Sequence, residues 1–348
     1  MNTVRVGLIG CGDIGVLRAQ ALAKSAAFRL ISVADVDAQR ASVLAAQYKA
    51  APDKDWAVML RRPDVDAVIV STPPDSHAEI AIAALRAGKH VLCEKPLART
   101  PEECRQMMDA AQTGHRTLAT GFNYRFYPSV MKAREFFDAG AIGDLDHIRS
   151  YTGYSASAHR QGWLHDVGIM GGGTLRDNGI HLIDTTLYFL GDPVDVQGYG
   201  TSLVWKFSGC EDNGFVLLRN SQGKIATLQS SWTEWTGYKF SVEIYGTKGC
   251  IRVRCFPMIT QVTTGGLKSG KRSRQSFYFP RVHFMEHLKS YRWIVWQSFV
   301  KEFEEFHAAI DGRKASIASG WDGLRAVDVA HRACLGSTRD NASESRDP

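Results

Sequence analysis

Two acid–base side chains, Asp177 and His181, lie four positions apart in the segment RDNGIHLID, residues 176–184. On a helix this spacing places both side chains on one face, where a carboxylate can orient an imidazole or raise its basicity. Such a pair is suited to removing a proton from a hydroxyl group. Two simpler interpretations stay open: Asp177 could cap the N-terminus of a helix, and His181 could be a hydrogen-bonded histidine at the edge of a core.

A glycine-rich turn, GCGDIG at residues 10–15, follows the short apolar run 4–9 and opens a helical pattern. In the pattern G-x-G-x-x-G, glycines permit a tight turn and let backbone N–H groups approach a pyrophosphate at the positive end of a helix. A purely structural strand-to-helix turn is the alternative. We expect the pyrophosphate of a dinucleotide to be bound by Gly10, Gly12, Asp13, Ile14 and Gly15.

An acidic residue, Asp35, follows the second predicted strand, 20 positions after Gly15. A carboxylate there can accept hydrogen bonds from the ribose hydroxyls of adenosine and would repel the extra phosphate of NADP. The next residues, Val36 and Asp37, supply no cation in its place. The sequence therefore favours NAD over NADP, although Asp35 could instead cap the following helix.

The elements that would position these residues alternate between strands and helices over the first 120 residues or so. The predicted strands are residues 4–9, 29–34, 67–71, 90–93 and 117–121, and the predicted helices are residues 14–24, 38–48, 79–87 and 101–113. Short apolar strands that alternate with helices are typical of a parallel, doubly wound sheet. We therefore predict an α/β Rossmann domain over residues 1–122.

The pattern changes after residue 121, where strand-like runs alternate with a period of two. The runs are residues 145–151, 194–204, 214–218, 225–232, 240–245 and 250–255, and helices are predicted at residues 127–139, 182–190, 291–310 and 320–334. Short turns between neighbouring runs indicate hairpins. We predict an α+β domain over 123–336 with a large, mostly antiparallel open sheet, a last helix that could pack back toward the Rossmann domain, and a polar tail over 337–348.

Three further segments of the sequence resemble the motifs of a known protein family. They are STPPDSH with ALRAGKHVLCEKP at 71–77 and 84–96, GFNYRF at 121–126, and GGGTLRDNGIHLID at 171–184. In order and spacing, from about residue 4 to residue 335, they resemble the Gfo/Idh/MocA oxidoreductases, the group of glucose–fructose oxidoreductase and inositol dehydrogenase. Three motifs in the right order make the resemblance specific for the family and not for a substrate.

The resemblance implies a catalytic group of Lys95, Asp177 and His181, with Lys95 reaching both the nicotinamide and the reacting hydroxyl. Whether Lys95 or His181 is the general base stays open. Beyond the glycine turn, the expected cofactor contacts are Asp35, Ser71, Thr72, Pro73, His77, Glu94, Lys95 and Asn123. The expected substrate contacts are Lys95, Tyr124, Arg125, Arg160, Trp163, Asp177, Asn178, His181 and Tyr238. His159 and His165 fall in the same segments, but no ligand spacing supports a metal site, and we expect no metal.

The predicted function is NAD-dependent hydride transfer between nicotinamide and a secondary alcohol of a sugar, aminosugar or cyclitol. Aromatic and hydrogen-bonding residues together suit a polyol, which has apolar faces and hydroxyl edges. One alternative is an NADP-dependent ketosugar or dihydrodiol reductase. The other is a ligand-sensing regulator of the same fold that has lost catalysis, against which the presence of Lys95, Asp177 and His181 argues.

The amino-acid composition of the chain narrows the class of protein further. The chain has 348 residues, 44% apolar and 22% charged, with a net charge of +6, which are ordinary values for a globular protein of two domains. The densest basic run is Lys268, Lys271, Arg272 and Arg274, read as a solvated loop or a patch for a phosphate or carboxylate. No motif for nucleic acid accompanies it. Seven cysteines at irregular spacing suggest neither a disulfide framework nor a zinc site.

The N-terminus runs directly into a strand without a signal pattern, and no window of about 18 apolar residues exists, so we expect a cytoplasmic protein with no membrane partner. We also expect a homodimer or homotetramer. Its interface would be the open face of the second sheet, to which we assign the apolar residues Trp232 and Val242.

Overall fold

The computed structural model describes residues 3–158, 162–267, 270–289 and 292–341. It consists of two compact units, each of which is described by itself. The first unit comprises Met1–Phe126 and Glu286–Leu324, and the second comprises Tyr127–Met285 and Arg325–Pro348. The predicted border at residue 122 lies near the first of these borders, whereas the segment 286–324 returns to the first unit.

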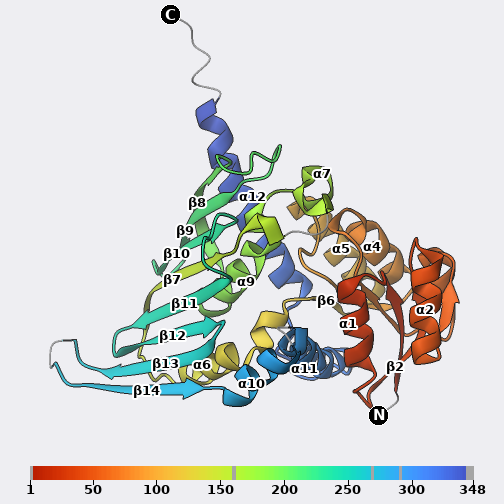
Figure 1. Cartoon of the computed structure of the whole chain (residues 1–348), viewed down its shortest axis with the longest axis horizontal. Helices are drawn as coiled ribbons and strands as arrows, with labels where there is room; N and C mark the ends of the chain where they lie inside the picture. The colour runs from red at the N-terminus through yellow and green to blue at the C-terminus, as the bar shows by residue number, and fades with distance from the viewer. Residues whose placement is uncertain (1–2, 159–161, 268–269, 290–291, 342–348) are drawn as a thin grey trace, which may run out of the picture. The chain divides into compact units, whose positions relative to one another are not determined.

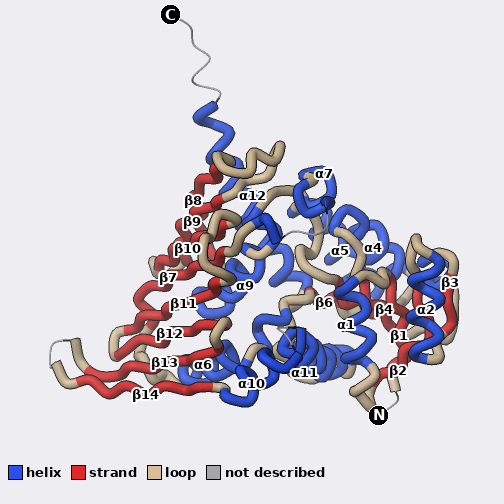
Figure 2. Tube along the Cα trace, in the orientation of Figure 1, coloured by secondary structure: helices blue, strands red, loops and turns tan. Residues whose placement is uncertain are grey.

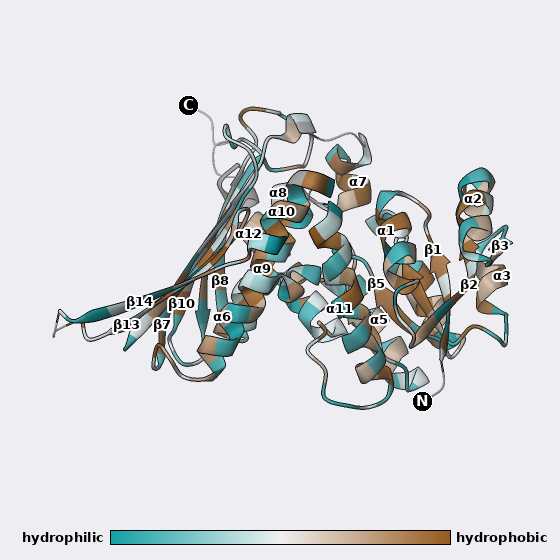
Figure 3. Cartoon of the chain, turned by 60° about the horizontal axis from the view of Figure 1, so that its bottom comes forward, coloured by the Kyte–Doolittle hydropathy of each residue, from teal (hydrophilic) through white to brown (hydrophobic). Residues whose placement is uncertain are grey.

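The first unit is built on a parallel sheet in which six strands are described, in the order β3-β2-β1-β4-β5-β6 (Figure 1). The strands are β1 (Val4–Ile9), β2 (Phe28–Ala34), β3 (Ala51–Asp53), β4 (Ala67–Val70), β5 (His90–Cys93) and β6 (Leu118–Thr120). The order reverses between β1 and β4, and in such sheets the crevice outside the carboxyl ends at this point is the usual ligand site. Their apolar composition is visible in Figure 3, and it reflects strands that are covered on both faces. The predicted Rossmann fold is confirmed.

Helices connect these strands. They are α1 (Asp13–Leu22), α2 (Ala38–Tyr48), α3 (Trp56–Leu60), α4 (His77–Arg86) and α5 (Pro101–Gly114). Local chemistry starts several of them: Asp37 caps α2 by accepting from the backbone N–H of Gln39 at 2.9 Å, and Thr100 caps α5 ahead of Pro101. The short elements β3 and α3 were not predicted, because three and five residues are too few to show a period.

A helix from late in the chain completes this unit. Helix α11 (Arg292–Ile310) packs against α1, and its aromatic side chains Phe299, Phe303 and Phe306 enter the same core as Phe28 of β2. The ring of Phe28 lies 5.8 Å from that of Phe303 and 6.1 Å from that of Phe306, measured between centroids. The first unit therefore depends on residues that are remote in sequence.

The second unit is built on a sheet in which eight strands are described, in the order β14-β13-β12-β11-β7-β10-β9-β8 (Figure 2). The strands are β7 (Leu145–Gly153), β8 (Pro193–Thr201), β9 (Asn213–Asn220), β10 (Ile225–Ser231), β11 (Lys239–Gly246), β12 (Gly249–Cys255), β13 (Met258–Gly265) and β14 (Arg272–Tyr278). All described pairs are antiparallel except β7 with β10, which is parallel. The prediction of a large, mostly antiparallel sheet is confirmed.

Helices cover one face of this sheet. Helix α9 (Gly179–Leu190) packs on β7, β10 and β11, and α6 (Pro128–Asp138) packs on β12 and β13. The hydroxyl of Ser150 in β7 lies 2.9 Å from that of Thr186 in α9, so even-numbered residues of β7 face the helices. Two shorter helices, α7 (Val167–Met170) and α8 (Thr174–Asp177), precede α9, and α10 (Pro280–Lys289) follows the sheet.

The assignment of Trp232 and Val242 to the open face of the sheet was wrong. Both side chains are fully buried. Val242 pairs with Ser150 and therefore shares the face that the helices cover. Trp232 lies one residue beyond the end of β10, where strand alternation no longer applies, and its indole N–H donates to Asp177. Apolar residues that are exposed on the open face include Tyr199, Phe215, Leu217 and Ile225.

Two other expectations change at the end of the chain. Helix α12 (Gly320–Asn341) extends seven residues past the predicted end at 334, so the first part of the predicted tail, 337–341, is helical. Arg272 and Arg274 belong to the edge strand β14 rather than to a loop. Lys268 lies outside the described residues.

Candidate functional site

The carboxyl ends of β1, β4 and β5 lie side by side, because these strands pair in parallel in that order. Gly10 follows β1, Ser71 follows β4, and Glu94 with Lys95 follows β5. Thus the glycine turn, the serine of the STPPDSH motif and the lysine of the EKP turn all occupy one edge of the sheet. The residues predicted in the first unit therefore follow neighbouring strands at the same edge.

The glycines of the turn are required by close backbone approach. A Cβ at Gly10, whose φ is +95°, would lie 2.5 Å from the carbonyl oxygen of Ser71, and one at Gly15 would lie 2.0 Å from that of Gly10. A Cβ at Gly12 would meet no atom within 4 Å, so space is open in front of the first turn of α1. Backbone N–H groups at the start of this helix have no partner within the helix itself. The turn therefore fits a dinucleotide pyrophosphate.

Asp35 is tied to this turn. Its carboxylate accepts from the backbone N–H of Cys11 at 2.6 Å and from that of Asp37 at 2.8 Å. The cap of α2 is Asp37, so the interpretation of Asp35 as a cap is not what the structure shows. A carboxylate held next to the glycine turn is placed to accept hydrogen bonds from a ribose.

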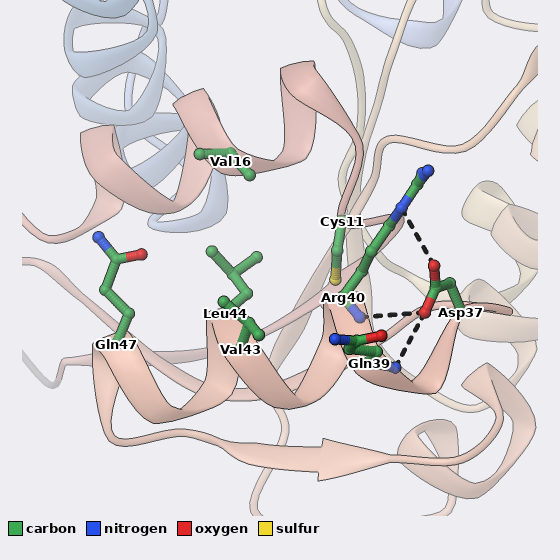
Figure 4. A pocket seen from close by; sticks show the side chains of 8 residues that line it. All are labelled: Cys11, Val16, Asp37, Gln39, Arg40, Val43, Leu44 and Gln47. Atoms are coloured by element: carbon green, nitrogen blue, oxygen red, sulfur yellow. Dashed lines mark hydrogen bonds and ion pairs between the residues drawn. The ribbon is translucent and has the colours of Figure 1, made fainter.

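A pocket of about 340 Å³ lies between α1 and α2 (Figure 4). It is lined by Cys11, Val16, Asp37, Gln39, Arg40, Val43, Leu44 and Gln47. The pocket borders the glycine turn, but neither Gly12 nor Asp35 is among the described residues that line it. It is therefore a neighbour of the candidate cofactor site and not the phosphate site itself. Burial raises the pKa of the Cys11 thiol in its wall to about 12, so this thiol stays protonated at neutral pH.

Lys95 follows a residue that is anchored in the core. The carboxylate of Glu94 lies 2.6 Å from the guanidinium of Arg18 in α1, and the same guanidinium lies 2.8 Å from Glu302 in α11. Arg18 and Glu302 are fully buried. The second carboxylate oxygen of Glu94 accepts from the backbone N–H of Lys95 at 3.2 Å. The backbone of the turn that carries the amine is thus fixed to two helices.

His77 joins this turn to the neighbouring one. One ring nitrogen lies 2.9 Å from the carbonyl oxygen of Pro96 and the other 2.9 Å from that of Thr72. The ring is fully buried, and burial lowers the pKa of His77. Both ring nitrogens of His77 thus contact backbone carbonyls and hold the two turns together. Pro73, which follows Thr72, is exposed and precedes the short helix Pro74–Ser76.

Three predicted residues directly after the predicted border at 122 lie in the short helix Asn123–Phe126, which belongs to the first unit. The amide of Asn123 donates to the hydroxyl of Ser298 in α11 at 2.8 Å, and Arg125 forms an ion pair with Asp322 at 3.0 Å. Tyr124 is half-buried. Both Asn123 and Arg125 are buried, and these contacts show a packing function that the sequence did not reveal.

Asp177 and His181 lie on consecutive helices of the second unit. Helix α8 ends at Asp177, Asn178 follows, and α9 begins at Gly179. The shared face of a single helix does not apply to this pair, because the helix is interrupted at Asn178, and α9 begins three residues before the predicted start at 182. Both residues are buried, with 7% and 6% of their surfaces exposed. Asp177 does not cap α9, whose N-cap position is Asn178.

Polar side chains from the strand ends hold this segment. The hydroxyl of Tyr154 and the indole N–H of Trp232, the latter at 3.2 Å, donate to the same carboxylate oxygen of Asp177. The amide of Asn178 donates to Thr152 at 2.9 Å and to the hydroxyl of Tyr238 at 2.8 Å. The structure thus brings three predicted residues, Asp177, Asn178 and Tyr238, into one network.

The glycine-rich segment before Asp177 wraps around a buried acid, Glu211. Its carboxylate accepts from the backbone N–H groups of Gly173 and Leu175, both at 2.8 Å. A Cβ at Gly173 would lie 2.3 Å from the carbonyl oxygen of Glu211, which explains the glycine. Burial raises the pKa of Glu211, although the two N–H groups and Arg176 act in the opposite direction. Glu211 therefore fixes the start of α8.

The remaining predicted substrate contacts are spread over one segment. Trp163 and His165 lie in the short helix Gly162–His165, and the His165 ring stacks on Phe207 with 4.0 Å between centroids. His159 and Arg160 lie outside the described residues. Among the described residues, no group of three or more His, Cys, Asp or Glu side chains could hold a metal ion. Nor is any helix in the described part of the chain long and apolar enough to cross a membrane.

Sequence reasoning missed several residues that position the candidate site: Arg18, Glu302, Tyr154, Trp232 and Glu211. Arg18 could have been noticed in the sequence, since a charged residue on the apolar face of a helix is unusual. The others could not, because their partners are 23 to 284 positions away.

The strand order, the glycine turn and Asp35 define a nucleotide-binding Rossmann unit, followed by a unit with an eight-stranded sheet. Residues 4–122 match the family model of the Gfo/Idh/MocA oxidoreductases described as an NAD-binding Rossmann fold, and residues 130–252 match the C-terminal domain of the same family. The chain is 31% identical to an inositol 2-dehydrogenase of Rhizobium meliloti, over 95% of this chain and 96% of that protein.

Comparisons with two other proteins support the same family. A levoglucosan dehydrogenase of Pseudarthrobacter phenanthrenivorans is 37% identical over 72% of this chain and 73% of its own. A solved structure of levoglucosan dehydrogenase in complex with NADH and L-sorbose matches with a TM-score of 0.87 and 26% identity, covering 98% of both chains. The chain belongs to the Gfo/Idh/MocA oxidoreductase family, and it is an enzyme of the dehydrogenase and reductase type.

Proposed function

We propose that the chain is an NAD-dependent dehydrogenase that oxidises a secondary alcohol of a sugar, aminosugar or cyclitol, or reduces the corresponding ketone. Similar proteins named for inositol and levoglucosan support the substrate class, and a similar structure that holds NADH supports the cofactor. Asp35 supports NAD over NADP, because it places a negative charge beside the glycine turn.

The observation that carries the proposal is the position of Lys95. It follows β5 at the carboxyl edge of the sheet, two strands from the glycine turn that follows β1. Its backbone is fixed through Glu94 and Arg18, and the carbonyl of Pro96 is held by His77. The backbone of the residue that carries the amine is thus fixed at the edge at which a Rossmann sheet binds its cofactor.

The chemistry requires two transfers from one alcohol. Bound NAD accepts the hydride from carbon. The hydroxyl proton goes to a base of the chain, and the candidates are the Lys95 amine and the His181 imidazole. In the first case, His181 and Asp177 would bind and orient the hydroxyl. In the second, Lys95 would polarise the hydroxyl while Asp177 supports the imidazolium.

A screen of sugars, nucleotide sugars and cyclitols with NAD and with NADP, read by the absorbance of the reduced nicotinamide, tests this proposal. We expect oxidation of at least one polyol with NAD and slower turnover with NADP. If NADP is used better, the chain is the NADP-dependent reductase instead. If neither cofactor supports turnover on any polyol but a polyol still binds, the ligand-sensing alternative is favoured.

We also propose that the chain assembles as a homodimer or homotetramer through the open face of its eight-stranded sheet. The face carries Tyr199, Phe215 and Leu217, with 61%, 45% and 43% of their surfaces exposed. A hollow of about 520 Å³, whose lining includes these three residues, lies on it. Exposed apolar groups gathered on one sheet face favour cover by a partner of the same kind.

A further inference from the structure

Two donors reach the carboxylate of Asp177 from adjacent strands. Tyr154 follows the end of β7 and Trp232 follows the end of β10. These two strands are the parallel pair of the second sheet, with Gly153 opposite Ser231. The backbone N–H of Tyr154 donates to the carbonyl of Ser231 at 3.0 Å, which continues the pairing by one residue. The two side chains therefore leave the same edge of the sheet and meet at one oxygen.

Trp232 and Tyr154 both remain hydrogen-bond donors toward the carboxylate of Asp177. An indole N–H only donates. Burial and the neighbouring carboxylate of Asp177 raise the pKa of Tyr154 far above the ordinary value for tyrosine, so its hydroxyl keeps its proton at neutral pH. Tyr154 is thus a permanent donor and not a candidate base. Hydrogen bonds from two donors favour the ionised form of a carboxylate.

We propose that Tyr154 is a positioning residue of this enzyme: its hydroxyl, together with the Trp232 indole, keeps Asp177 ionised and fixes the direction of its carboxylate. This inference rests on the proposed function, which assigns Asp177 to the catalytic group with His181. An ionised, oriented carboxylate is the form that can support an imidazolium, whereas a protonated one cannot.

The chain offers a matched control on the same strand. The hydroxyl of Tyr151 in β7 donates to the carboxylate of Glu234 at 2.6 Å. Tyr151 and Asp177 are not linked by any described hydrogen bond, since odd-numbered residues of β7 face away from α9. Tyr154→Phe and Tyr151→Phe remove the same atom and the same kind of bond, a hydroxyl that donates to a carboxylate.

Steady-state kinetics with NAD and the polyol found in the screen test the proposal. In Tyr154→Phe we expect kcat to fall about 10- to 100-fold, the usual scale for removing a residue that orients a site ligand, with the KM for NAD unchanged. The acid limb of the pH–rate profile should move to higher pH, because the carboxylate becomes easier to protonate. Tyr151→Phe should keep the wild-type kcat and profile. Wild-type kinetics in Tyr154→Phe, or equal losses in both variants, would overturn the proposal.

A second readout does not depend on turnover. The indole N–H NMR signal of Trp232, assigned from its loss in Trp232→Phe, should titrate as Asp177 gains a proton. The midpoint should move to higher pH in Tyr154→Phe and stay in place in Tyr151→Phe. A moved midpoint supports the proposed role of Tyr154 even if the polyol screen fails, and that failure would then count against the proposed function alone. An unmoved midpoint contradicts the role of Tyr154.

Discussion

Arg18 and Glu94 form a buried ion pair at 2.6 Å, although 76 positions separate them in the chain. The guanidinium also meets Glu302 at 2.8 Å and lies 4.2 Å from the centroid of the Phe299 ring. One side chain thus connects the helix that begins at the glycine turn, the residue before Lys95, and α11. Its removal should therefore affect both the stability of the fold and the turn that carries Lys95.

Arg18→Met should lower the free energy of unfolding by about 3–5 kcal/mol, because it leaves two carboxylates buried without their counter-ion. Arg5→Met is the comparison, since Arg5 pairs with Asp66 at 2.8 Å on the surface and its loss should lower the free energy of unfolding far less. Urea unfolding measures both. Equal losses of unfolding free energy in the two variants would show that the buried ion pairs of Arg18 stabilise the fold no more than a surface pair does.

Lys95→Ala should keep the fold and the affinity for NAD, because the glycine turn and Asp35 are untouched, and should lower kcat by about 100-fold or more. Circular dichroism, NAD titration and steady-state rates measure these three properties. Near-normal turnover in Lys95→Ala would remove the enzymatic role that we assign to the turn.

His181→Ala distinguishes the two candidate bases. If the imidazole is the base, this variant loses at least as much kcat as Lys95→Ala, and the acid limb of the pH–rate profile disappears. If Lys95 is the base, the acid limb persists in His181→Ala. The full profile of each variant, and not a rate at one pH, is therefore the measurement.

Cofactor choice should depend on Asp35. We expect wild-type protein to bind NAD more tightly than NADP by a few kcal/mol, the order of one close repulsion between like charges in a partly desolvated site. Asp35→Ser with Val36→Lys should shift the preference toward NADP. Because Asp35 also accepts from Cys11 at 2.6 Å, Val36→Lys alone is the control that adds charge without loosening the turn. Equal wild-type affinities for both cofactors would contradict this prediction.

Oligomerisation of the chain should depend on the open face of the eight-stranded sheet. Leu217→Glu places a charge among exposed apolar residues and should convert the proposed dimer or tetramer into monomers, as measured by light scattering at micromolar concentration. Val43→Glu is the matched control, because Val43 is an exposed apolar residue of α2, remote from this sheet in sequence. A wild-type monomer, or dissociation by Val43→Glu as well, would exclude the proposed interface.

The surface pair of Arg5 and Asp66 should contribute stability that depends on pH. The hydrogen bond from Arg5 lowers the pKa of Asp66 below its ordinary value of 3.8. A lowered carboxyl pKa gives stability that is present above the unfolded-state value and is lost as pH falls through the folded-state value. Asp66→Asn should therefore be less stable than wild type at neutral pH, by at most about 1 kcal/mol for groups this exposed, and equal to it in strong acid. A difference that persists in acid would argue against the ionic origin.

Much of the first unit could be predicted, because its strands and helices have strong local patterns. The predicted strand 90–93 and helix 38–48 coincide with β5 and α2. The edge strand β14 was missed, since its RSRQSFY sequence is polar, as edge strands often are to discourage further pairing. Val242 shows the limit of alternation, which tells which residues share a face and not which face the helices cover.

The candidate site likewise has a part that local sequence predicts and a part that it does not. Asp35 and the glycine turn are set by nearby residues, so their neighbourhood was predictable from local motifs. The partners of Asp177 were not, because Tyr154 and Trp232 approach it only through the parallel pairing of β7 and β10. Nor was the anchor of Glu94, whose third member comes from a helix late in the chain.

The position of α11 has a consequence for the order in which the chain folds during synthesis. Residues 1–126 emerge first, but the aromatic side chains that cover Phe28 and the acid that pairs with Arg18 are made only after residue 286. At ribosomal speed the delay is on the order of tens of seconds. For that time the nascent Rossmann sheet exposes an apolar side and an arginine with an incomplete set of partners. Residues 127–285, which supply all of the second sheet, emerge within that interval. The part of the chain that is translated first is thus completed only after almost all of the chain has been made.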